Sequence, residues 1–219
     1  MPRPLASPLS HLRAPALSEP LAELTARADL RRYRKNSLLI QEGDQGDTLF
    51  IIVSGRLRSF SIGDKDREIT YGVYGPGEYI GEMSLDGGPR SASVIALESS
   101  VCAVVTRQTL EAYIAQRPAF AFDLLAKVIR RARAATLNAR QLALNDVYGR
   151  LKLLLDSLAV QGPNGRRLIA ERLTHKEMAN RLGCSREMVS RLTKDLERGE
   201  LLKVTDQGME LAATLPMRW

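Results

Sequence analysis

The feature that most constrains the fold of this chain is an abrupt change of pattern near residue 107. Residues 31–106 contain short runs rich in β-branched and aromatic residues, among them TLFIIVSG, EITYGVYG and SASVIALE, and glycine-bearing turns separate these runs. In residues 107–145, by contrast, proline disappears after Pro118 and no glycine occurs until Gly149. Many short strands at this spacing predict an all-β barrel or jelly roll. The segment that follows predicts one long helix.

This predicted helix carries a narrow apolar stripe. Apolar or small residues recur along it in steps that alternate between four and three, which is the spacing of a heptad repeat. The stripe consists of Leu125, Ile129, Ala132, Thr136, Ala139 and Ala143. A helix with a single narrow stripe usually needs a partner, and alanines allow two helices to approach closely. We therefore predict a parallel homodimer; the alternative is a helix that lies on its own barrel.

Residues 146–219 form a second compact unit in this prediction. DVYGRLKLLLDSLA has the pattern of an amphipathic helix, and QGPNGRR carries strong turn signals. LLKVTDQGMELA has the pattern of a β-hairpin, with Asp206, Gln207 and Gly208 at the bend. Between these segments lies THKEMANRLGCSREMVSRLTKDLERGELL, which predicts two helices around a tight turn.

The two helices around this turn have clear start and stop signals. Thr174 can cap the first helix, and Glu177, three residues on, completes a capping box. Gly183 permits the sharp turn, and Ser185 can cap the second helix. Apolar residues line the inner face of both helices: Met178, Ala179, Leu182, Met188, Val189, Leu192 and Leu196. The arrangement predicts a helix-turn-helix.

The second helix leaves a polar, charged face outward: Arg186, Glu187, Ser190, Arg191 and Lys194. These side chains suit the reading of base edges, because arginine can bond guanine bidentately and glutamate can accept from the amino group of cytosine. The alternative is a solvated face whose charges pair at helical spacing. The formal net charge of +7 also favours a polyanionic partner, although a basic but unspecialised surface would carry the same charge.

Several other protein classes find no support in the sequence. The longest apolar runs, such as Leu49 to Val53, fall far short of the ~20 residues that span a bilayer. The proline-rich N-terminus predicts a disordered arm rather than a signal peptide, so we expect a cytoplasmic protein. Two cysteines, Cys102 in an apolar alternating run and Cys184, are too few for a disulfide framework or an iron–sulfur cluster. With only His11 and His175 besides, no zinc, haem or other cofactor is expected, and no Ser/His/Asp arrangement indicates an enzyme.

A second candidate site lies in YGPGEYIGEMSLDGGPRSASVIALE. The pattern is that of a strand, a short turn of helix, a glycine-rich loop and another strand. Arg90 stands between the loop and the following strand, beside Ser91. An arginine fork, a hydroxyl group and exposed backbone amides can hold one phosphate, and Glu82 can accept a hydrogen bond from a ribose hydroxyl. The alternative is that Arg90 is a surface residue after a turn.

The helix-turn-helix segment resembles the winged helix-turn-helix of the cAMP receptor protein (CRP)/FNR family of bacterial transcription regulators. The residues that carry the resemblance are Gly183, Cys184, Ser185, Arg186, Glu187, Val189 and Arg191. It implies that Arg186, Glu187 and Arg191 read the bases of a TGTGA-like half-site. Thr174, Lys176 and Ser185 are then expected to contact phosphates. Ser190 lies on the same face, and His175 either contacts the DNA backbone or has a surface role beside the cap.

The second candidate site resembles the phosphate-binding cassette of cyclic-nucleotide-binding domains. The matching residues are Gly81, Glu82, Arg90, Ser91 and Ala92. The resemblance implies that Glu82 holds the ribose 2′-OH while Arg90 and Ser91 hold the cyclic phosphate, with Met83 and Ser84 in the same site. It also implies that the nucleobase meets the long helix at Arg131 and Thr136. At the neighbouring position, where the family carries a residue with a hydroxyl group, this chain has Ala135. Because the loop between Glu82 and Arg90 is shorter than in familiar cAMP-binding members, cyclic di-GMP or no nucleotide are alternatives to cAMP.

Together these observations predict an α+β protein with an N-terminal cyclic-nucleotide-binding jelly roll, a long dimerisation helix and a C-terminal winged helix-turn-helix. The expected boundaries are a disordered arm at 1–20, the β-barrel domain at 21–107, the dimerisation helix at 108–145 and the DNA-binding domain at 146–219. The resemblance implies a homodimeric transcription regulator whose partners are double-stranded DNA, a cyclic nucleotide and RNA polymerase. The alternative, a nucleotide-sensing module that acts on a protein partner, is disfavoured by the segment CSREMVSR.

Overall fold

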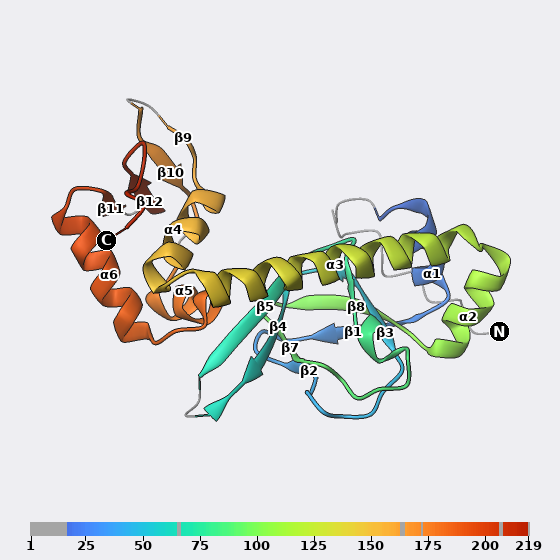
Figure 1. Cartoon of the computed structure of the whole chain (residues 1–219). Helices are drawn as coiled ribbons and strands as arrows, with labels where there is room; N and C mark the ends of the chain where they lie inside the picture. Colours follow the sequence, from blue (N-terminus) through green and yellow to red (C-terminus); the bar gives the residue numbers. More distant parts are fainter. Residues whose placement is uncertain (1–16, 65–66, 163–164, 172, 206–207, 219) are drawn as a thin grey trace. The chain divides into compact units, whose positions relative to one another are not determined.

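The computed structural model of the chain describes residues 17–64, 67–162, 165–171, 173–205 and 208–218. The chain divides into two compact units (Figure 1). The first unit contains Met1–Ser61 and Tyr71–Val128, and the second contains Ile62–Thr70 and Ile129–Trp219. Residues 1–16 of the disordered arm predicted at 1–20 lie outside the described residues, and Glu19 and Pro20 at its end already belong to helix α1.

Two four-stranded antiparallel sheets account for the β-rich half of the chain. Their strand orders are β1-β8-β3-β6 and β2-β7-β4-β5. The strands are β1 (Asp29–Tyr33), β2 (Leu38–Ile40), β3 (Leu49–Ser54), β4 (Leu57–Ile62), β5 (Glu68–Tyr74), β6 (Tyr79–Ile80), β7 (Ser93–Ala96) and β8 (Ser100–Val105). One cluster of buried side chains draws on strands of both sheets, among them Ile40, Phe50, Val94 and Cys102. The core therefore lies between the sheets, as expected for the predicted jelly roll.

Strand β3 is buried on both of its faces. Phe50 and Ile52 belong to the core between the sheets, whereas Leu49 and Ile51 pack in a second cluster with residues of helices α1 (Glu19–Ala26) and α2 (Arg107–Gln116). Successive side chains of a strand point to opposite faces, so an uninterrupted apolar run such as LFIIV is what a doubly covered strand requires. Cys102 is fully buried in the core, as its apolar alternating run indicates.

The single helix predicted over residues 107–145 is instead two helices, and this prediction was wrong. Helix α2 ends at Gln116, and helix α3 (Ala119–Leu144) begins after Pro118. Arg117, the residue between α2 and the proline, leaves the helical region with φ −132° and ψ 75°. A proline disfavours helical backbone in the residue before it. The predicted heptad stripe, which begins at Leu125, lies entirely within α3. Phe120 is the one residue of α3 that is buried among those described.

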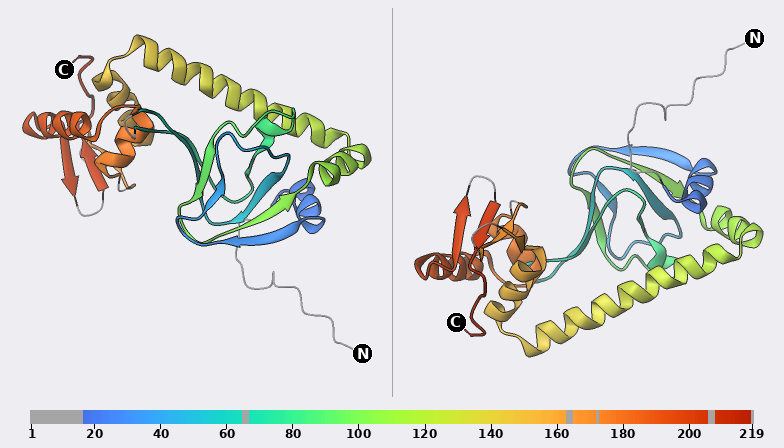
Figure 2. Two further views of the ribbon diagram at one scale, coloured as in Figure 1. Left: turned by 90° about the horizontal axis from the view of Figure 1, so that it is seen from below. Right: turned by 90° about the horizontal axis from the view of Figure 1, so that it is seen from above.

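The second unit packs three helices against a small sheet. The helices are α4 (Val147–Leu158), α5 (His175–Leu182) and α6 (Arg186–Arg198), and the strand order is β11-β12-β10-β9. The strands are β9 (Val160–Gln161), β10 (Arg167–Ile169), β11 (Leu202–Thr205) and β12 (Gly208–Leu211). The pairing of β11 with β12 confirms the predicted hairpin, although Asp206 and Gln207 at its bend lie outside the described residues. Both views of Figure 2 show this hairpin beside α6.

One apolar core joins the helices and the sheet of the second unit. It contains Leu151 from α4, Met178 from α5, Leu196 from α6 and Leu211 from β12. The outer face of α6 is thereby left without cover from its own unit. Within the described part of the chain, no helix is long and apolar enough to cross a membrane.

Candidate functional sites

Helix α5 begins and ends where its sequence signals predict. The side chain of Thr174 accepts a hydrogen bond from the backbone N–H of Glu177 at 3.2 Å, and the Glu177 carboxylate accepts one from the N–H of Thr174 at 2.7 Å. These two bonds form the predicted capping box. At the other end, Gly183 adopts a left-handed conformation with φ 64°, which glycine tolerates without strain. The turn therefore directs the chain straight into α6.

Helix α6 is anchored by its cap and by its inner face. The Ser185 side chain accepts a hydrogen bond from the N–H of Met188 at 3.2 Å, as predicted for a cap. Val189 and Leu196 are fully buried, while Met188 and Leu192 are only half-buried. Sequence reasoning missed Thr193, which is buried because its hydroxyl group donates to the carbonyl oxygen of Val189 at 2.9 Å.

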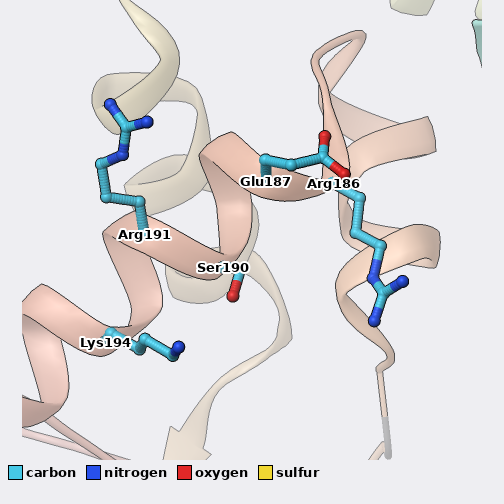
Figure 3. A pocket seen from close by; sticks show the side chains of 5 residues that line it. All are labelled: Arg186, Glu187, Ser190, Arg191 and Lys194. Carbon is cyan, nitrogen blue, oxygen red and sulfur yellow. The ribbon is translucent and has the colours of Figure 1, made fainter.

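The outer face of α6 presents the five residues predicted to face outward. They line an open hollow of about 420 Å³ and project from the same helix (Figure 3): Arg186, Glu187, Ser190, Arg191 and Lys194. Among the described residues, none of the four charged side chains forms an ion pair with a neighbour. Glu187 and Arg191 stand four residues apart and still do not pair, which argues against a face stabilised by helical charge pairs. Their donors and acceptors are free for a ligand.

The remaining predicted DNA contacts lie at the start of α5. Lys176 is exposed, whereas the hydroxyl group of Thr174 is already engaged in the capping box. His175 is half-buried, and its Nε2 lies 3.1 Å from the hydroxyl oxygen of Thr193. The imidazole therefore contacts α6 and joins the two helices, a role that no local sequence signal indicates.

Sequence reasoning also missed Arg150, on α4. Its Nε donates to the carbonyl oxygen of Leu182 at 3.1 Å, and its Nη1 donates to the carbonyl oxygen of Asn145 at 3.0 Å. Carbonyl groups at a helix end lack partners within the helix and favour a nearby positive charge. Arg150 thus satisfies the ends of both α3 and α5. No local signal marks this residue, because the Leu182 carbonyl lies 32 residues away in the chain.

The predicted cassette forms around the 3₁₀ helix η2 (Glu82–Ser84). Gly81 precedes it with φ 90°, and a Cβ atom at this position would stand 2.7 Å from the carbonyl oxygen of Thr48 and 2.8 Å from Nη1 of Arg90. Only glycine allows both the backbone conformation and this close approach. Glu82 and Ser84 are buried beside it.

Arg90 is buried in the cassette, with 8% of its surface exposed, so the alternative of a surface residue after a turn is wrong. Its Nη1 donates to the carbonyl oxygens of Thr48 and Gly81, at 3.0 and 3.1 Å, and to the hydroxyl oxygen of Ser84 at 2.7 Å. Its Nη2 donates to the hydroxyl oxygen of Thr48 at 2.8 Å. Burial lowers the pKa of Arg90, and the charges of Asp47 and Glu82 oppose this shift.

The other predicted effector residues are more open. Ser91 is exposed and its hydroxyl group donates to the sulfur of Met83, itself exposed, at 3.4 Å, while Ala92 is half-buried. Arg131 is half-buried on α3, and Thr136 is exposed with its hydroxyl group donating to the carbonyl oxygen of Ala132 at 3.0 Å. The structure thus brings Gly81 together with the buried residues Glu82, Ser84 and Arg90 in one cluster.

Two family models match the chain. A cyclic nucleotide-binding domain matches residues 30–117, and a Crp-like helix-turn-helix domain matches residues 149–213. The first match contains the cassette, and the second contains α5, α6 and the small sheet.

Known proteins match along most of the chain. The Cyclic AMP receptor protein of Thermus thermophilus is 34% identical over 187 residues, which cover 85% of this chain and 83% of that protein. A CRP-like cAMP-activated global transcriptional regulator of Mycobacterium tuberculosis is 31% identical and covers 80% of each chain. Among solved structures, the c-di-GMP-responsive global regulator CLP of Xanthomonas campestris has a TM-score of 0.78 at 25% identity, covering 89% of this chain and 99% of that one.

These matches extend over both units, and the relatives are transcription regulators, not enzymes. The agreement of both family models with the cassette and the helix-turn-helix described above leads to one conclusion: the chain belongs to the cAMP receptor protein (CRP)/FNR family of bacterial transcription regulators.

Proposed function

We propose that this protein is a homodimer that reads a TGTGA-like palindrome through α6 and is controlled by a cyclic nucleotide, with cAMP as the first candidate. The observation that carries the DNA-binding part is the outer face of α6, where Arg186, Glu187 and Arg191 are exposed and unpaired among the described residues. Arginine recognises guanine through two hydrogen bonds, and glutamate recognises the amino group of cytosine. Ser190 completes this face.

Phosphate contacts are proposed at the two helix starts of the helix-turn-helix. Lys176 supplies a charge, and the exposed residues Thr174 and Ser185 stand at helix N-termini, where backbone N–H groups favour anions. His175 is proposed to act from behind this surface, because its ring contacts Thr193. Phosphate contacts fix the position of a recognition helix, and base contacts supply the specificity.

The proposal of a homodimer is supported by the composition of α3. The proposed seam consists of Leu125, Ile129, Ala132, Thr136, Ala139 and Ala143, and every one of these residues is exposed. Leu125 exposes 53% of its surface and Ile129 41%. Apolar side chains left open on one long helix match the interface of a parallel coiled coil. Two copies joined in this way can present recognition helices ~34 Å apart, one turn of DNA.

The effector is proposed to bind at the cassette, through Arg90 and Ser91 to its phosphate and through Glu82 to its ribose. Gly81, Met83, Ser84 and Ala92 form the rest of the cassette, and Arg131 and Thr136 are proposed to meet the base. Two relatives that match most of the chain are named for cAMP, which favours this nucleotide.

Cyclic di-GMP is the second candidate effector. One structural neighbour with a TM-score of 0.78 is described as responsive to cyclic di-GMP. The short loop between Glu82 and Arg90 also favours a pocket that differs from that of familiar cAMP-binding members. We further propose domain boundaries at 21–107, 108–145 and 146–219, with the dimerisation helix of the middle segment limited to α3 (Ala119–Leu144). A cytoplasmic location and RNA polymerase as the protein partner complete the proposal.

The proposed function is tested by fluorescence anisotropy of the full chain on a labelled TGTGA palindrome and on a scrambled sequence. Each titration is run without nucleotide, with cAMP and with cyclic di-GMP. We expect preference for the palindrome and a change of DNA affinity with one of the two nucleotides. Equal binding to both DNA sequences would refute sequence-specific reading, and a response to cyclic di-GMP alone would replace cAMP by the second candidate.

A further inference from the structure

We infer that Thr48 and Ser84 are positioning residues, whose hydroxyl groups hold the Arg90 guanidinium so that its Nε–Nη2 edge meets the phosphate of the effector. The inference rests on the proposed function, because it concerns how the same cassette binds its nucleotide. It adds one residue, Thr48, which lies outside the cassette, and it gives Ser84 a specific role within the cassette. Thr48 stands between β2 and β3, 42 residues before Arg90.

The two hydroxyl groups accept hydrogen bonds from different nitrogen atoms of the same guanidinium. Thr48 Oγ1 accepts from Nη2 at 2.8 Å, and Ser84 Oγ accepts from Nη1 at 2.7 Å. The Ser84 hydroxyl group in turn donates to the carbonyl oxygen of Gly81 at 3.2 Å, which orients its lone pairs toward Arg90. A planar guanidinium held at both terminal nitrogens cannot rotate freely about its long side chain.

The count of donors shows which edge remains for a ligand. A guanidinium has five N–H donors. The two on Nη1 serve three acceptors, and one on Nη2 serves Thr48 Oγ1. Among the described residues no acceptor is bonded to Nε, and Nη2 keeps a second N–H. These two remaining donors lie side by side and match the two oxygens of a phosphate.

Gly46 keeps the same edge open. A Cβ atom on Gly46 would stand 2.9 Å from Nη2 and 3.0 Å from Nε of Arg90, nearer than to Cζ at 3.2 Å. The absent side chain therefore leaves room beside the Nε–Nη2 edge. Arg90 and Gly46 both line a hollow of about 200 Å³ next to Thr48 and Phe50, and the acidic residues Asp44 and Asp47 belong to the same lining. Arg90 and Gly46 thus border the same open space, whereas the Nη1 donors of Arg90 are engaged by Thr48, Gly81 and Ser84.

This arrangement suits the binding of an anion. Because the guanidinium is largely removed from water, its charge is poorly solvated. The oxygens of a phosphate can supply the interactions that water no longer provides. Since Thr48 and Ser84 fix its orientation before the ligand arrives, less conformational freedom is lost on binding. Removing either hydroxyl group should therefore weaken nucleotide binding even though neither residue needs to touch the nucleotide.

The test is calorimetric titration of the full chain with cAMP and with cyclic di-GMP. The variants are Thr48→Val, which keeps the shape and removes the hydroxyl group, Ser84→Ala, and the conservative Thr48→Ser. For the nucleotide that the wild type binds, we expect Thr48→Val and Ser84→Ala to raise Kd by about fivefold or more, as for one lost hydrogen bond. Thr48→Ser keeps the hydroxyl group and should bind the nucleotide as the wild type does. Thermal unfolding of each variant checks that the fold persists.

Each outcome decides one part of the inference. If the wild type binds a nucleotide and Thr48→Val and Ser84→Ala bind it equally well, the positioning role is wrong while the proposed function stands. If Thr48→Ser binds as weakly as Thr48→Val, packing and not the hydroxyl group matters, and the inference is overturned. If the wild type binds neither nucleotide, the proposed control by a cyclic nucleotide fails together with this inference, whereas the proposed reading of DNA is decided by the anisotropy experiment.

A second variant tests the assigned edge by itself. Gly46→Ala adds a methyl group beside Nε and Nη2, and Gly46 lies outside the left-handed region of backbone conformation. We expect this variant to fold as the wild type does and to bind nucleotide at least about tenfold more weakly, since both remaining donors are obstructed. Unchanged binding would assign the phosphate to another edge of Arg90.

Discussion

At the residue scale, two arginines of this protein, Arg90 and Arg191, differ in burial and in hydrogen bonding, and these differences suit different ligands. Arg90 is buried, held by four hydrogen bonds and surrounded by backbone carbonyls. Arg191 is exposed on α6 and has no partner among the described residues. A buried, oriented arginine suits one small anion, whereas an exposed one can adjust to the edge of a base pair.

Replacing Arg191 by alanine should weaken binding to a TGTGA-type palindrome by ~1–3 kcal/mol and relax the preference at one base pair. The measurement is anisotropy against the palindrome and its single-base variants. Arg198→Ala is the matched control, because Arg198 lies at the far end of the same helix with an exposed side chain. If the variant loses the same affinity for the palindrome and for random DNA, Arg191 contacts the DNA backbone and does not read a base.

Replacing Arg90 by glutamine should weaken nucleotide binding by at least about tenfold, because a hydrogen bond to a charged group contributes about 1.5–3 kcal/mol. Calorimetric titration measures this change. Arg107→Gln serves as the control, since Arg107 is exposed and bonds Glu111 four residues along α2. A variant at Arg90 that binds as well as the wild type would show that the cassette is not the effector site.

At the scale of elements, helix α4 is tied to strand β10 through one carboxylate. Asp156 accepts from Lys152 on the same helix at 2.7 Å and from Arg167 on β10 at 2.6 Å. Burial by itself would raise the pKa of Asp156, but the hydrogen bonds and charges of Lys152 and Arg167 outweigh it and hold the pKa below its ordinary value of 3.8. The ionised form is therefore the one that stabilises the folded second unit.

Asp156→Asn should lower the free energy of unfolding by about 1–3 kcal/mol at pH 7, as for a lost hydrogen bond to a charged partner. Because the folded pKa is depressed, the stabilisation is present above pH 3.8 and is lost as the pH falls through the folded value. Urea unfolding of the two proteins at neutral and acidic pH measures the difference. A difference that stays constant down to the most acidic pH would exclude the charge of Asp156 as its cause.

At the scale of the whole molecule, the exposed apolar residues of α3 pose the question of assembly. Phe120 alone is buried among the described residues of this helix, while Leu125, Ile129 and Leu137 are exposed. Association of two copies along α3 would remove this surface from water at about 25 cal/mol per Å². A palindrome contains two half-sites related by two-fold symmetry, and each half-site is read by one recognition helix, so a dimer is needed to read both.

Ile129→Glu places a charge in the proposed seam, so it should yield monomers in sedimentation velocity and abolish binding to the palindrome. Ala134→Glu is the control, because Ala134 is exposed and lies two residues past Ala132, on the side of α3 away from the seam. A dimer of unchanged stability in Ile129→Glu would place the interface elsewhere on the molecule.

The sequence by itself determined the features that depend on neighbouring residues. The capping box of Thr174 and Glu177, the left-handed Gly183 and the cap at Ser185 involve residues within a few positions of one another. The alternation of side chains along β3, which places Phe50 and Leu49 in different clusters, is a local feature as well. The break at Pro118 is also a local feature, but residues 107–145 were predicted as one helix although this proline lies among them.

Only the tertiary structure decided the contacts that join distant parts of the chain. The partners of Arg90 at Thr48, of Arg150 at Leu182 and of His175 at Thr193 are separated from them by 42, 32 and 18 residues. Nothing in the residues next to Arg90 indicates whether its guanidinium is exposed or enclosed. That depends on which loop the folded barrel brings over it, because burial and orientation of a side chain arise from packing and not from local propensity.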